Sequence, residues 1–105
     1  MIAFHHDPLT HTLTCSISGR MDTDVASQVQ REIDAKLAEV ADPDLKVIFL
    51  MSGVEYIASA FMRVCLTVLK RLPPQHFKFL QCTPFVRKAL TVAGFDTLVP
   101  ISDEE

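Results

Sequence analysis

The chain has 105 residues, of which 49% are hydrophobic and 22% are charged, and its formal net charge is −3. This size and apolar content suit a single folded domain, residues 1–105, and exclude intrinsic disorder. The acidic balance argues against nucleic acid as the main partner, because such binding needs clustered cations. No apolar run approaches the roughly 20 residues that cross a membrane, and residues 1–7 lack the pattern of a signal peptide.

Two short strands are predicted at the start of the chain. Ile2 and Phe4 alternate with other residues and suggest a short first strand, and apolar and polar side chains alternate over residues 13–18, as they do in half-buried strands. The turn-forming residues 7–10 lie between them, so we expect an antiparallel hairpin. Residues 19–24 then break the alternation.

The next apolar pattern has the period of a helix. Its single stripe comprises Val25, Val29, Ile33, Leu37 and Val40. Asp22, Thr23 and Asp24 come directly before it and are suited to cap the helix or to lie in its first turn. The Asp-Pro-Asp sequence at 42–44 ends this helix.

A buried strand and a second helix are predicted in the middle of the chain. Residues 47–51 are all apolar, which is typical of a central strand covered on both faces. Residues 52–55 have the composition of a polar turn, and a helix is expected from Ala58 or Ser59 to Leu72. The buried stripe of this helix comprises Phe61, Val64, Cys65, Val68, Leu69 and Leu72.

The last third of the chain predicts a strand, a helix and a short final strand. Residues 77–80 form the first of these, and Thr83 caps a helix with proline at its first position. Gly94 lies where a glycine commonly ends a helix. Residues 98–101 are predicted to form the final strand and residues 102–105 a solvated tail. The inner face of this third helix comprises Val86, Ala89, Leu90 and Ala93.

The predicted order of elements is β-β-α-β-α-β-α-β. This order indicates an α/β fold with a mixed sheet of four to five strands and three main helices. The chain has only three glycines and no phosphate-binding glycine loop, so no nucleotide cofactor is expected.

Ser59 lies where the second helix begins, and two interpretations apply to it. As an N-cap, its hydroxyl would satisfy a first-turn N–H group, which is worth roughly 1 kcal/mol. As a phosphoacceptor, it would place a phosphate at the positive end of the helix dipole. The two roles are compatible.

Other candidate sites are weaker. His5, His6 and His11 flank the first turn, but their spacing matches no standard metal site, so we expect surface histidines. Cys15 and Cys82 each precede an arginine by five residues, one short of the spacing in a phosphatase loop. A thiol enzyme is therefore a minor alternative, and buried, reduced thiols in a cytosolic protein are expected.

Five segments resemble, in order and spacing, the STAS domains of bacterial anti-sigma factor antagonists. Residues 19–22 are similar to the family's G-x-x-D, and 47–50 to its central strand. Residues 58–62 fall on its D-S-S-G-L phosphorylation motif, and 84–90 on its P-x-V-x-x-x-L helix. Residues 94–95 fall on its Gly-Leu before the last strand.

The resemblance implies a cytoplasmic binding protein without catalytic residues, cofactor or metal, which is a monomer or a weak dimer. Its partner would be an anti-sigma factor with serine kinase activity, which phosphorylates Ser59 and is thereby released. A serine phosphatase would reset the cycle. The implied partner-binding residues are Asp22, Thr23, Ala58, Ser59, Ala60, Met62 and Arg63.

The chain departs from the family motif around Ser59. Ala58 replaces the acid, Ala60 the second serine and Phe61 the glycine. Phe61 either points into the core or projects and reshapes the docking surface. These departures favour the alternative function, a STAS interaction subunit without a switch in a sensory scaffold or a transporter ATPase complex.

Overall fold

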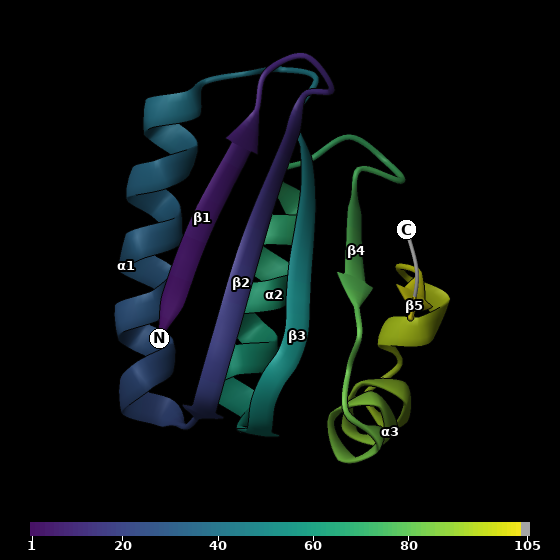
Figure 1. Ribbon diagram of the computed structural model, residues 1–105. Coiled ribbons are helices and arrows are strands. Elements are labelled where there is room, and N and C mark those ends of the chain that lie inside the picture. The colour runs from purple at the N-terminus through teal and green to yellow at the C-terminus, as the bar shows by residue number, and fades with distance from the viewer. Residues whose placement is uncertain (104–105) are drawn as a thin grey trace.

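The strands and helices of residues 1–103, the part described by the computed structural model, follow the predicted order (Figure 1). Glu104 and Glu105 of the expected tail lie outside the described residues. The elements are β1 (Ile2–Asp7), β2 (Thr12–Met21), α1 (Thr23–Val40), β3 (Lys46–Ile57), α2 (Ser59–Lys70), β4 (Phe77–Leu80), α3 (Pro84–Val92), a 3-10 turn (Phe95–Thr97) and β5 (Ile101–Ser102).

The five strands form one sheet in the order β1-β2-β3-β4-β5. β1 pairs antiparallel with β2, as the predicted hairpin requires, and β2 to β5 run parallel to one another. The predicted mixed sheet with three main helices is therefore confirmed. β2 and β3 are parallel neighbours, so their carboxyl ends lie side by side. The helices that follow them, α1 and α2, therefore begin at the same end of the sheet.

The core lies between the helices and one face of the sheet. Phe49 is at its centre, with ring centroids of Phe77 at 4.9 Å, Phe79 at 6.0 Å and Phe61 at 6.3 Å. The other buried side chains of the helices that join this cluster are Ala26, Val29, Ile33, Val64, Cys65, Val68, Val86 and Leu90.

The expectation that β3 is covered on both faces is wrong. Val47, Phe49 and Met51 belong to the core, whereas Ile48 and Leu50 lie on the opposite face, where Figure 1 shows no helix. The strand order explains this. Crossover connections are right-handed, so helices that link strands advancing in one direction across a sheet all fall on the same face.

Two predicted interruptions are also absent, because β2 continues to Met21 and β3 to Ile57. Gly53 belongs to the strand rather than to a turn. A Cβ atom there would lie 2.9 Å from the Cβ of Ser18 on β2, so the glycine permits close approach of the two strands. The register of β2 with β3 shifts twice between Ser16 and Arg20, as it does where a β-bulge interrupts the pairing.

The remaining differences concern element ends. Residues 98–100 are not in a strand, because the 3-10 turn at 95–97 precedes a strand of two residues. Ala93 is exposed rather than on the inner face of α3. Thr83 caps α3 and Gly94 follows it with φ 90°, as predicted. Within residues 1–103, no helix has both the length and the apolar character that a bilayer span requires.

Candidate functional site

The starts of α1 and α2 are held side by side by the pairing of β2 with β3. Met21 and Ile57, the last residues of these strands, are partners in the register. The N–H group of Ala58 donates to the carbonyl of Met21 at 2.9 Å, which extends the pairing to the first residue beyond β3. Asp22 and Ser59 therefore lie at one edge of the molecule, although 37 positions separate them in the chain.

Ser59 is exposed and is the first residue of α2. It is therefore not the N-cap that one interpretation of the sequence predicted. The N-cap is Ala58, whose φ of −92° and ψ of 166° keep it in the extended conformation of β3. The helix begins one residue earlier than the N-cap interpretation of Ser59 requires, because Ala58 is the last extended residue bonded to β2 and takes the N-cap position itself. No side chain caps this terminus, and its first turn contains no acid.

Phe61, at the position of the family glycine, points into the core. Its side chain is fully buried and its ring lies 6.3 Å from that of Phe49. Of the two orientations left open by the sequence, the structure has the buried one. The surface around Ser59 is therefore not reshaped by a projecting phenylalanine.

Most predicted partner residues gather at the starts of the two helices. Asp22 is exposed and caps α1, its Oδ1 atom accepting from the N–H of Val25 at 3.0 Å. Thr23, Ala60 and Arg63 line a shallow hollow of about 340 Å³ between α1 and α2. Ala58 and Ser59 directly precede Ala60, which lines this hollow, in the sequence.

Met62 does not line this hollow. It lies on the side of α2 that faces α3, as part of an apolar surface that was not predicted from the sequence. It lines a hollow of about 360 Å³ between α2 and α3, together with Phe85 and Val92. Phe85 is 61% exposed and Val92 79% exposed. A signal was present in the sequence, because these two apolar residues, seven positions apart, lie off the buried stripe of their helix.

A stack of side chains connects this apolar surface to the end of β2. The guanidinium carbon of Arg20 lies 4.5 Å from the ring centre of Tyr56, its partner in the register, and Tyr56 lies 6.4 Å from the ring of Phe85. Tyr56 was not singled out from the sequence, and Arg20 was considered only as the arginine that follows Cys15 and as part of residues 19–22. Their stacking depends on the register of β2 with β3, which local patterns do not reveal.

The three cysteines are buried and free, as expected. Burial raises the pKa of Cys15 to about 12 and that of Cys82 to about 11, and it raises the pKa of Cys65 well above its usual value. All three thiols are therefore protonated near neutral pH. Since the thiolate is the nucleophile, the thiol-enzyme alternative has no support in this geometry.

His11 pairs with acids rather than with the other histidines. Its Nδ1 atom lies 2.7 Å from Oδ2 of Asp42, and this contact raises the pKa of His11 and lowers that of Asp42. Among residues 1–103, the only cluster of potential metal ligands is His11 with Asp42 and Asp44. Asp42 of this cluster is bonded to His11 in the ion pair, and His5 and His6, which also flank the first turn, do not belong to the cluster.

Comparison with known proteins identifies the family to which this chain belongs. The model of the STAS domain family matches residues 5–105. BtrV of Bordetella bronchiseptica, named as an anti-sigma factor antagonist, is 26% identical over 99 residues, which are 92% of this chain and 83% of that protein.

Solved structures share the fold. An anti-sigma factor antagonist from Mycobacterium paratuberculosis superposes with a TM-score of 0.83 at 19% identity, over 99% of this chain and 86% of the other. The anti-sigma factor antagonist SpoIIAA in its unphosphorylated form superposes with a TM-score of 0.75 at 19% identity, over 97% of this chain and 90% of the other.

Proposed function

Because the chain belongs to the STAS domain family, we propose that it is an anti-sigma factor antagonist, a cytoplasmic protein that acts by binding and not by catalysis. Its partner is an anti-sigma factor with serine kinase activity. The unphosphorylated chain, a monomer or a weak dimer, binds this partner through the starts of α1 and α2. Phosphorylation of Ser59 ends the interaction, and a serine phosphatase restores it.

The observation that carries this proposal is the N-terminus of α2, which has no side-chain cap and has the exposed Ser59 as its first residue. Ser59 offers its hydroxyl to a kinase, and no side chain of the described residues competes for the first-turn N–H groups. A phosphate on Ser59 adds a charge of about −1.5 to −2 beside these donors. The positive end of the helix dipole stabilises that charge in the free protein.

The surroundings explain how this charge would end binding. The hollow formed by Met62, Phe85 and Val92 flanks the start of α2 and offers apolar area to a partner. A partner that covers it must remove water from the neighbouring Ser59. Burial of a doubly charged phosphate without new cationic partners is costly, so the modified protein would dissociate. Arg63, one helical turn after Ser59, is placed to pair with the phosphate in the free form.

A second candidate function follows from the two alanines beside Ser59. Ala58 and Ala60 remove the carboxylate and the second hydroxyl with which a kinase active site would contact the family motif. A STAS interaction subunit that docks without a switch, in a sensory scaffold or a transporter ATPase complex, fits these replacements. In that role the same surface would bind its partner constitutively.

One affinity purification from the native host distinguishes the two. Wild type, Ser59→Ala, Ser59→Asp and the control Gln28→Asp, which adds the same charge on an exposed face of α1, are used as baits. The switch predicts a serine-kinase-like anti-sigma factor captured by all except Ser59→Asp. Capture of a scaffold or transporter component by all four baits would replace the switch with constitutive docking.

A further inference from the structure

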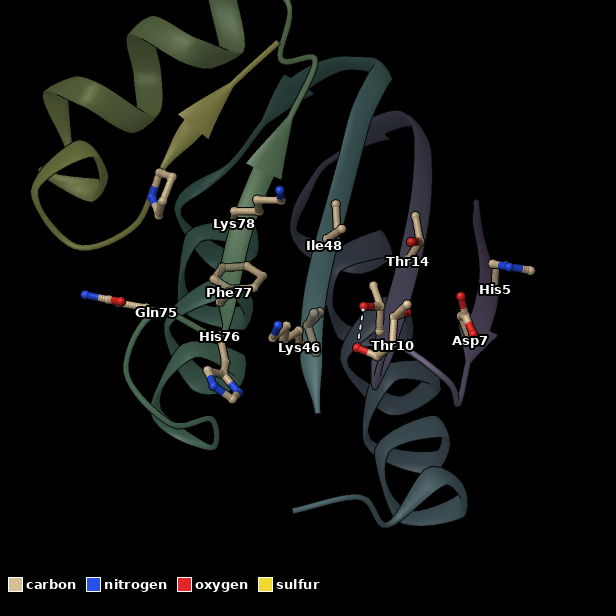
Figure 2. A pocket seen from close by; sticks show the side chains of 13 residues that line it. His5, Asp7, Thr10, Thr14, Lys46, Ile48, Gln75, His76, Phe77 and Lys78 are labelled. Atoms are coloured by element: carbon tan, nitrogen blue, oxygen red, sulfur yellow. Dashed lines mark hydrogen bonds between the residues drawn. The ribbon is translucent and has the colours of Figure 1, made fainter. Parts of the chain in front are cut away.

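The sheet face opposite the helices contains a groove of about 580 Å³, larger than either hollow beside Ser59 (Figure 2). It crosses the starts of β3 and β4, whereas Ser59 follows the other end of β3. The groove is therefore a separate surface from the proposed partner site. Its volume lies in the range of small-molecule sites.

The register of the sheet builds this groove from two rows of side chains. In one row, Thr14 on β2, Ile48 on β3 and Lys78 on β4 are consecutive partners. In the other row, Thr12 pairs with Lys46, two residues before Ile48 and on the same face. Figure 2 shows Thr14, Lys46, Ile48 and Lys78 on this side of the sheet.

The two lysines give one half of the groove an unbalanced positive charge. None of the ion pairs within residues 1–103 involves Lys46 or Lys78. The one carboxylate of the lining, Asp7, lies at the opposite end, on β1, where it accepts from the N–H of Leu9. A cationic patch on a chain of net charge −3 favours an anionic ligand at the β3–β4 side.

The floor between the lysines is apolar. Ile48 is 7% exposed although no helix packs on it, so the side chains of neighbouring strands cover it. The aliphatic stems of lysines commonly cover apolar surface in this way, with the ammonium groups at the rim. A ligand here would meet an apolar base, two ammonium groups and the hydroxyl of Thr14.

We propose that this groove binds a small organic anion that carries one phosphate or carboxylate group on a flat apolar body. The anionic group contacts the ammonium groups of Lys46 and Lys78, and the apolar body lies on the aliphatic stems of these lysines and on the exposed edge of Ile48 between them. This arrangement satisfies both cations and covers apolar surface on the sheet face that the helices do not reach. The inference does not depend on phosphorylation of Ser59 or on an anti-sigma partner.

The test is a titration of the isotope-labelled 105-residue chain with phenyl phosphate, in which binding is followed by backbone amide chemical shifts. We expect saturable shifts at Thr14, Ile48 and Lys78, and at least fivefold weaker binding in Lys46→Gln and in Lys78→Gln. Lys70→Gln, on the exposed face of α2, is the matched control and should bind as the wild type does. The unchanged spectrum of each variant elsewhere verifies its fold.

Four outcomes would overturn the proposal. Absence of shifts at millimolar phenyl phosphate, or shifts confined to the hollow of Met62 and Phe85, would remove the site. Equal binding of benzyl alcohol would show that the lysines contribute nothing. Equal binding of inorganic phosphate would show that the floor at Ile48 takes no apolar body.

Discussion

The starts of α1 and α2 are neighbours in space and differ in what holds them. α1 begins with a side-chain cap, because Asp22 accepts from the N–H of Val25, and Asp24 lies in its first turn. α2 begins at Ser59, with no side-chain cap and no acid in its first turn. Instead, its third residue, Phe61, is fully buried, and the N–H of Ala58 is bonded to β2.

The difference shows that a helix start can be fixed by polar capping or by packing, and that only the second leaves its donors available. At α1 the local charge is already complementary to the helix dipole, so a further anion there would meet like charges. At α2 the dipole is unopposed, and Ser59 stands at its end. The start of α1 thus has a side-chain cap and an acid, whereas the start of α2 can accept a negatively charged group.

The largest effect is expected from Phe61→Ala, which removes the packing that fixes α2. Truncating a fully buried phenylalanine costs about 3–5 kcal/mol in the free energy of unfolding. The equivalent third residue of α1 is Val25, which is only partly buried. Urea unfolding should therefore show a much smaller loss for Val25→Ala. Equal losses at the two positions would mean that α2 is not anchored in this way.

A smaller effect is expected from Asp22→Ala, which removes the cap of α1. Loss of an N-cap carboxylate costs about 1 kcal/mol in unfolding free energy. Asp22→Ser keeps a side-chain acceptor and should retain most of the stability in the same urea measurement. If Asp22→Ala is neutral and instead only weakens partner binding, the residue belongs to the docking surface and contributes nothing as a cap.

The elements that could be predicted from sequence are those whose signal is local. The cap at Thr83 and the apolar stripes of the helices follow from side-chain spacing alone, and the structure confirms them except at Ala93, which is exposed, and Leu72, which lies beyond the end of α2. The predicted turn at 52–55 failed because Gly53 is required by the approach of Ser18, a residue 35 positions away. The single-residue error at Ser59 has a similar origin, because the bond from Ala58 to Met21 makes Ala58 the last extended residue, so that the helix begins at Ser59 and not after it.

The surfaces were less predictable than the fold. The Arg20–Tyr56–Phe85 stack and the groove of Lys46 and Lys78 both arise from strand register, which places residues from distant segments in one row. Phe85 was within reach of sequence reasoning, since an apolar residue off the buried stripe indicates a contact surface. The lysines were not, because a charged residue at a strand end is usually solvated.

The smallest effect on stability is expected from Ala58→Asp. This substitution gives α2 an aspartate at its N-cap, as α1 has in Asp22. The new carboxylate would accept from a first-turn N–H group. The N–H of Phe61 already donates to the carbonyl of Ala58 at 3.0 Å, so the gain in unfolding free energy should be only about 0.5–1 kcal/mol.

The same substitution tests whether the open donors of α2 matter for a charge on Ser59. In the wild-type background, Ser59→Glu should stabilise the protein by about 0.3–1 kcal/mol through the helix dipole. In the Ala58→Asp background, that gain should shrink or reverse, because the donors are occupied and the two carboxylates repel. Four urea unfolding curves complete this double-mutant cycle. Strict additivity would mean that the uncapped terminus gives no advantage to a negative group at Ser59, and the contrast between the two helix starts would have no bearing on a phosphorylation switch.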